Sequence, residues 1–166
     1  MPGYKGHIAG ATTIGVAYAS VVAVTYTQAL TEKPVFLAKP QILVGLVVIA
    51  IMFGLWPDVD TNSKGQDVFY GLAFAMDVGL ILTHRLEAAA ILGLLAMTPV
   101  LGKHRGWTHS KLAMLLVPSA IFALPVLYRP DLLGLSALIY GAATLGYFSH
   151  LLLDGKIVPW IRVKCG

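Results

Sequence analysis

Charged residues and cysteine are both scarce in this chain. Only 12% of its 166 residues are Asp, Glu, Lys or Arg, against about a quarter in soluble domains, and 57% are hydrophobic. A chain of this length cannot hide so much apolar surface in its own core, so we expect the bilayer to solvate most of it. The single cysteine, Cys165, excludes a disulfide framework and a thiolate metal cage. Any metal site must therefore use nitrogen and oxygen ligands.

A basic stripe of the kind that binds nucleic acid is also missing. The twelve Lys and Arg residues behind the net charge of +4 are scattered between apolar runs, so a nucleic-acid partner is not expected. They instead indicate orientation, because Lys and Arg are enriched in cytoplasmic loops. With six crossings, Lys33, Lys39, Arg85 and Arg129 fall on one side. The larger group falls on the side of both termini, which we expect to be cytoplasmic: Lys5, Lys64, Lys103, Arg105, Lys111, Lys156, Arg162 and Lys164.

Six apolar segments alternate with polar or Pro/Gly-rich breaks. All six predict helices, because an open strand would leave its backbone polar groups unpaired in lipid. The first and last are long enough to cross ~30 Å of hydrocarbon, whereas the middle ones are shorter, and the third and fourth are either short spans or a re-entrant pair. We expect one all-α integral membrane domain, residues 1–166, with an uncleaved first helix. The segments are Ile8–Leu30, Ile42–Trp56, Val68–Thr83, Leu86–Leu101, Leu112–Tyr128 and Leu132–Leu153.

Side chains that can bind metal lie at the ends of these segments, and six crossings place four such clusters on one membrane face. His150 and Asp154 are four residues apart at a helix end, so their side chains share one face of that helix. Ionisable residues at membrane depth are costly and mark functional sites. The candidate metal ligands are His7, Asp58, Asp60, His104, His109, His150 and Asp154. Trp56, Trp107 and Trp160 flank the same face and are typical of an interfacial aromatic belt.

A known family shares this ordered series of motifs: His7, Pro57-Asp58-x-Asp60, His104-Arg105-Gly106-x-Thr108-His109-Ser110 and His150-x-x-x-Asp154. The chain resembles the YdjM-like inner-membrane proteins, which are described as LexA-regulated, membrane-bound, metal-dependent hydrolases. The resemblance implies a bacterial or archaeal inner-membrane protein with a hydrolase site. The series is also distantly similar to zinc-dependent phospholipase C and its related nucleases, although this chain lacks their N-terminal Trp ligand and is much shorter.

Together, the residues and the resemblance predict a hydrolase that uses zinc or a similar divalent ion. A site at headgroup level favours a phosphoester of a lipid or lipid-linked substrate, cleaved at the cytoplasmic face. Such an ion lowers the pKa of water towards ~7 and so supplies a nucleophile at neutral pH. One Asp left off the metal would act as general base, while Arg105 and the metal would stabilise developing negative charge. The candidate catalytic residues are Asp60, Arg105 and His109.

Two other functions are compatible with the same residues. In the first, the donors bind a transported metal ion or proton, and Asp77, midway along the third segment, continues the path across the membrane. In the second, the polar face docks a partner protein without catalysis. An enzyme would keep its fold and lose turnover on Asp60→Asn, whereas a transporter would show metal flux that depends on Asp77.

Overall fold

Six α-helices make up the part of the chain that the computed structural model describes, and that part contains no strand. The described residues are 3–28, 39–59, 64–101 and 107–157. The helices are α1 (Tyr4–Gln28), α2 (Pro40–Leu55), α3 (Lys64–Leu82), α4 (Leu86–Leu101), α5 (Lys111–Tyr128) and α6 (Leu133–Leu153), with the short 3₁₀ helices η2 (Trp56–Asp58) and η3 (Pro130–Leu132). The predicted all-α class is confirmed, and each helix overlaps one predicted segment.

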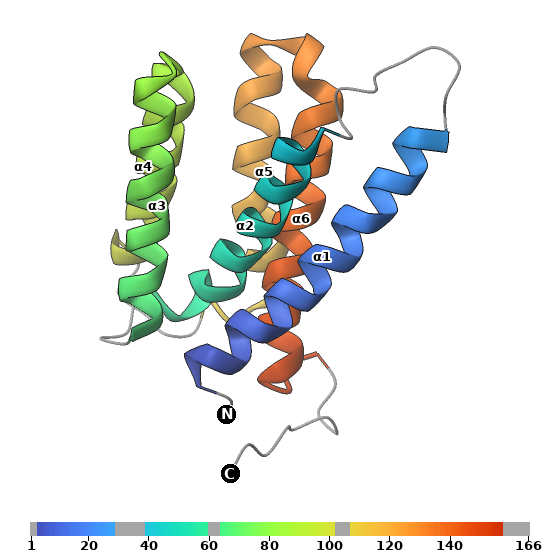
Figure 1. Cartoon of the computed structure of the whole chain (residues 1–166). Coiled ribbons are helices and arrows are strands. Elements are labelled where there is room, and N and C mark those ends of the chain that lie inside the picture. The colour runs from blue at the N-terminus through green and yellow to red at the C-terminus, as the bar shows by residue number, and fades with distance from the viewer. Residues whose placement is uncertain (1–2, 29–38, 60–63, 102–106, 158–166) are drawn as a thin grey trace.

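Five of the described helices are long and apolar enough to cross a membrane: α1, α2 together with η2, α3, α5 and α6 with η3. The fourth helix contributes a shorter apolar stretch, Leu86–Met97. The third is longer than predicted, because it begins at Lys64, before the apolar run that starts at Val68. Figure 1 shows α3 extending from the end of the bundle near the N-terminus to the opposite end, where the chain turns into α4.

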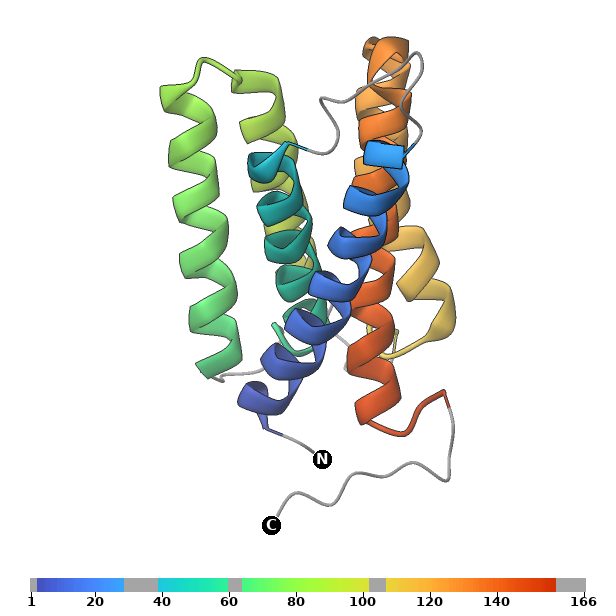
Figure 2. The same ribbon diagram turned by 45° about the vertical axis from the view of Figure 1, so that its right-hand side comes forward.

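The helices α1, α2 and α6 pack closely at small residues. A Cβ at Gly146 of α6 would overlap the backbone of α2, with the Cα of Ala50 only 2.8 Å away, and a Cβ at Gly54 of α2 would lie 2.5 Å from that of Ala11 in α1. Membrane helices associate largely through van der Waals packing at such small residues, because apolar side chains gain no hydrophobic free energy by leaving lipid. These contacts set the relative positions of the three helices, which lie together in both views (Figures 1 and 2).

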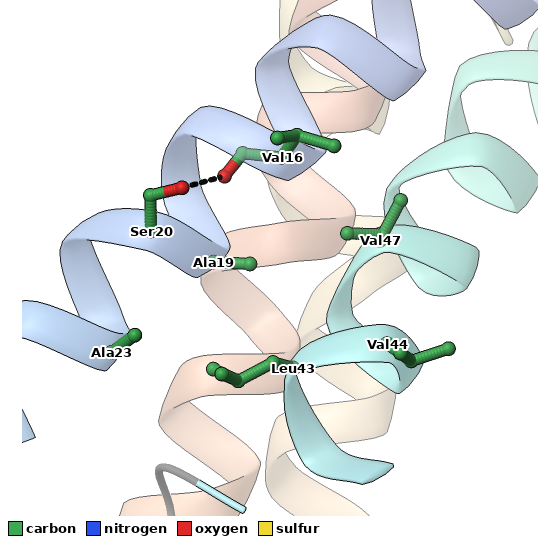
Figure 3. A pocket seen from close by; sticks show the side chains of 7 residues that line it. All are labelled: Val16, Ala19, Ser20, Ala23, Leu43, Val44 and Val47. Carbon is green, nitrogen blue, oxygen red and sulfur yellow. Dashed lines mark hydrogen bonds between the residues drawn. The ribbon is translucent and has the colours of Figure 1, made fainter. Parts of the chain in front are cut away.

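An apolar groove between α1 and α2 begins about two and a half helical turns from His7 along α1. Its lining consists of Val16, Ala19, Ser20, Ala23, Leu43, Val44 and Val47 (Figure 3). The hydroxyl of Ser20 donates to the carbonyl of Val16 at 2.9 Å, so this polar group is satisfied within its own helix. The groove offers an apolar surface suited to lipid, and it contributes nothing to the polar cluster described below.

Candidate metal site

Five of the seven predicted ligands meet at the end of the bundle where the N-terminus lies (Figure 1). They come from the start of α1, from η2, from the turn before α5, from the last turn of α6 and from the residue directly after α6: His7, Asp58, His109, His150 and Asp154. The other two predicted ligands, Asp60 and His104, lie outside the described residues, as does Arg105. Segments at both ends of the chain thus contribute to one cluster.

The imidazole of His109 occupies the centre of the contacts. Its Nε2 atom lies 3.3 Å from Oδ1 of Asp58 and 3.5 Å from Oδ2 of Asp154. The Nε2 atom of His150 lies 3.3 Å from Nε2 of His109 and 3.3 Å from Oδ2 of Asp154. Asp58, Asp154 and His150 therefore surround the Nε2 atom of His109 at nearly equal distances.

A stacked pair of imidazoles forms the buried side of the cluster. The rings of His7 and His150 have centroids 3.9 Å apart and planes inclined by 18°, and the two residues are 1% and 0% exposed. The Nε2 atom of His7 lies 3.6 Å from Oδ1 of Asp154 and 3.9 Å from Oδ2 of Asp58. Stacking directs both Nε2 atoms towards the same two carboxylates.

Outer hydrogen bonds orient two of the imidazoles. The Nδ1 atom of His150 lies 2.8 Å from the carbonyl oxygen of Gly54, which only accepts hydrogen bonds. In the neutral ring Nδ1 therefore carries the proton and donates, which leaves the lone pair on Nε2 for the cluster. The Nδ1 atom of His109 lies 3.2 Å from the hydroxyl of Thr108. Metal-binding histidines commonly have their second nitrogen engaged in this way.

The spacing of the donor atoms fits a bound divalent ion. Ligand atoms about 2.1 Å from a tetrahedral zinc ion are separated from one another by about 3.4 Å. The Nε2-to-carboxylate distances in the cluster run from 3.3 to 3.9 Å. In addition, Oδ1 of Asp154 and Nδ1 of His7 are buried without a hydrogen-bond partner in the part of the chain that the structure describes. A cation would satisfy the carboxylate oxygen, so the residues present fit a metal.

The electrostatics of the cluster also favour a positive charge. Hydrogen bonds to Asp154 and Asp58 raise the pKa of His109 to about 9, although burial by itself lowers it. Burial by itself raises the pKa of Asp154, but its hydrogen bonds with His109 and His150 and the positive charge on His150 and His7 together hold the pKa well below its usual range. Attraction between the carboxylates and the imidazoles underlies both pKa shifts, because carboxylates partly removed from water favour a nearby cation. A metal ion would take the place of the proton that His109 holds.

Asp154 owes its position to the way in which α6 ends. The N–H of Gly155 donates to the carbonyl of Leu152 at 3.0 Å, and that of Lys156 donates to the carbonyl of Leu151 at 2.9 Å. This pair of bonds is a Schellman motif, whose turn residue adopts a left-handed backbone. Gly155 does so, with φ of 68°. The glycine thereby fixes the direction in which Asp154 leaves the helix.

Replacing Gly155 by alanine is expected to lower the free energy of unfolding by about 1 kcal/mol, because a Cβ disfavours the left-handed conformation. The unfolding midpoint in mixed detergent and SDS micelles measures the change. Gly79→Ala is the matched control: it lies within α3, a Cβ there meets no atom within 4 Å, and we expect an unchanged or slightly higher midpoint. Equal midpoints for both variants would show that the turn does not depend on glycine.

The structure corrects the prediction for one of the three tryptophans. Trp56 is 2% exposed and packs against Tyr147 and Trp107, with ring centroids 5.7 Å away in each case, so its assignment to an interfacial belt is wrong. It is enclosed because α2 ends against α6. Trp107 is 42% exposed, as a belt residue would be, and Trp160 lies outside the described residues.

Two residues that shape the cluster were not predicted from the sequence. The carbonyl of Gly54 accepts a hydrogen bond from Nδ1 of His150, and Tyr147 donates a hydrogen bond to the carbonyl of Thr108 next to His109. The position of Tyr147, three residues before His150, placed it on the same face of α6 and was the available signal. A backbone carbonyl such as that of Gly54 leaves no such signal.

Comparison with known proteins places the chain in a family. No curated protein and no solved structure matches it. The model of the YdjM inner membrane protein family matches residues 1–157, a range that includes all six helices and the five clustered ligands. The predicted location in the inner membrane is thereby confirmed, in agreement with the long apolar helices. The chain belongs to the YdjM family of inner membrane proteins.

Proposed function

We propose that this chain is a membrane-bound, metal-dependent hydrolase that cleaves a phosphoester of a lipid or lipid-linked substrate at the cytoplasmic face. The convergence of three imidazole Nε2 atoms and two carboxylates at one end of the bundle carries the proposal. A bound ion of the zinc type supplies Lewis acidity, which activates water and polarises a phosphoryl oxygen. The residues that would hold it are His7, His109, His150 and Asp154, and Asp58 beside them is left off the metal as the base.

The cluster has a closed side and an open side. The side chains of His7, His150 and Asp154 are at most 4% exposed, whereas those of Asp58 and His109 are 35% and 17% exposed. Substrate and water therefore approach past Asp58 and His109. With the ion held by the histidines and Asp154, the carboxylate of Asp58 can accept a proton from the attacking water and return it to the leaving oxygen. Asp60 as an alternative base and Arg105 as the group that stabilises developing negative charge stay predictions.

The position of the cluster supports a lipid substrate. The donors lie at the ends of helices that are long and apolar enough to span the bilayer, which supports a depth near the headgroups. Phosphate esters of membrane lipids are located at this depth. Trp107, whose indole is partly exposed beside the open edge, presents the kind of surface that membrane interfaces favour.

The test compares Asp58→Asn with Asp131→Asn, a substitution in the exposed Arg129–Asp131 pair at the other end of the bundle. Zinc-loaded protein in detergent is assayed with bis(p-nitrophenyl) phosphate, and with phosphatidylglycerol and phosphatidylethanolamine vesicles followed by phosphorus NMR. We expect Asp58→Asn to reduce turnover by roughly 100-fold or more, since the loss of a general base costs about that much, while Asp131→Asn matches the wild type. Equal turnover in Asp58→Asn, or none in the loaded wild type, contradicts the proposal.

Transport of a metal ion or proton is the second candidate, and one observation favours it. Asp77 lies midway along α3, and its Oδ1 atom is buried without a hydrogen-bond partner among the described residues. Such a group inside a membrane segment commonly serves a path for ions. Zinc flux into proteoliposomes that disappears in Asp77→Asn, together with absent phosphoester turnover, would favour transport over hydrolysis.

A further inference from the structure

The loop that carries His109 differs from the other segments of the cluster. His7 and His150 belong to long helices, whereas His109 lies in the turn Trp107–Ser110. The N–H of Ser110 closes this turn by donating to the carbonyl of Trp107 at 3.1 Å, and on one side the hydroxyl of Ser110 joins the turn to α5 by accepting from the N–H of Ala113 at 3.0 Å. Ser110 thus caps α5 and does not contact the cluster through these bonds.

On the other side the turn is joined to α6 through Tyr147. The hydroxyl of Tyr147 donates a hydrogen bond to the backbone carbonyl of Thr108, and these two residues are 0% and 1% exposed. The hydroxyl of Thr108 in turn contacts Nδ1 of His109 at 3.2 Å. A continuous series of polar contacts therefore leads from the interior of α6 to the imidazole of His109.

Aromatic packing holds Tyr147 in the position from which it makes this bond. Its ring is inclined by 41° to that of Trp56, and Trp56 in turn meets Trp107, at the start of the turn, edge to face at 83°. A buried hydroxyl needs a partner, so its bond to the Thr108 carbonyl is favoured over an unpaired alternative. Packing and hydrogen bond together hold the turn against η2 and α6.

We propose that Tyr147 is a positioning residue for His109. Its hydroxyl holds the carbonyl of Thr108, and thereby sets the distance of the His109 Nε2 atom from the remaining donors, without itself touching the metal. The inference rests on the metal site of the proposed function. It means that α6 supplies His150 directly and also determines where the imidazole from the preceding turn lies.

Cobalt(II) binding tests this role, because visible d–d absorption reports the number and arrangement of ligands. Tyr147→Phe keeps the ring that packs on Trp56 and removes only the hydroxyl. We expect its cobalt affinity to fall about 10- to 100-fold, as on loss of other outer partners of metal ligands, and its absorption spectrum to change. Tyr140→Phe is the control: Tyr140 also lies in α6, its ring contacts Phe122 at 6.0 Å, and we expect wild-type affinity and spectrum.

The same substitution in a His109→Ala background separates positioning from general stability. If Tyr147 acts through His109, Tyr147→Phe causes no further loss of cobalt affinity in that background, because the effect of the pair is not additive. A further loss of the same size, or a single variant with unchanged affinity and spectrum, would overturn the inference. Absence of cobalt binding by the wild type would instead refute the proposed metal site, and the inference with it.

Discussion

His150→Ala protein is expected to retain less than roughly a tenth of the metal that the wild type carries, because loss of a direct ligand costs more than the 10- to 100-fold caused by loss of an outer partner. His150 belongs to both groups of three donors that could hold an ion, and its imidazole is fully buried. Removal of the His150 imidazole also leaves the ring of His7 without its stacking partner. Metal content per chain, measured by plasma mass spectrometry on detergent-purified protein, gives the result directly.

The control for this experiment is His84→Asn. His84 is exposed in the turn between α3 and α4, with φ of 57°, a backbone conformation that asparagine tolerates. Its metal content should equal that of the wild type. Asp154→Asn provides a second test with a nearly isosteric side chain, in case His150→Ala fails to fold. Metal at wild-type stoichiometry in folded His150→Ala and Asp154→Asn would exclude the cluster as the binding site.

Gly146→Ala is expected to destabilise the bundle by about 3 kcal/mol or more, at or beyond the upper end of ordinary overpacking. The added methyl group would meet backbone atoms of Ala50, among them the carbonyl carbon at 2.7 Å, and backbone cannot rotate aside as a side chain can. Separation of α2 from α6 would also move Asp58 away from His150. Size-exclusion profile and thermal midpoint in detergent measure the loss.

Two comparisons give this prediction its specificity. Gly45→Ala, also in α2, places a methyl group where no atom lies within 4 Å, and we expect a folded protein of unchanged midpoint. Gly54→Ala meets first the Cβ of Ala11 at 2.5 Å, so the second substitution Ala11→Gly should restore part of its stability. No side-chain substitution at Ala50 should rescue Gly146→Ala. Wild-type stability of Gly146→Ala would show that the two helices are less closely packed than the structure indicates.

The helices were predictable because lipid allows so few alternatives. An apolar run that must pair its own backbone groups becomes a helix, so each predicted segment overlaps a helix of the structure. Ends were less predictable where polar residues continue a helix beyond its apolar part. Lys64 to Asp67 precede the apolar run and nevertheless form the first turn of α3, since residues near a membrane surface can remain helical in water or headgroups.

The candidate site was predictable where ligands share a helix and less so where tertiary packing places them. His150 and Asp154 follow from their spacing of four, and the crossings of the membrane bring His7, Asp58 and His109 to the same end. The contact of Gly54 with His150 depends on how closely α2 approaches α6. A sequence pattern does not encode such a distance.

The donor set also determines when the site is completed during synthesis. His7, whose side chain lies 3.6 Å from that of Asp154, comes from the first helix of the described chain, and Asp154 directly follows the last. Chains emerge from the ribosome N-terminal part first, so His7, Asp58 and His109 enter the membrane before α6 has been made. Only the arrival of α6 adds His150 and Asp154. At the proposed site, metal loading would therefore be a late event of biogenesis, one that a nascent chain arrested before α6 could not perform.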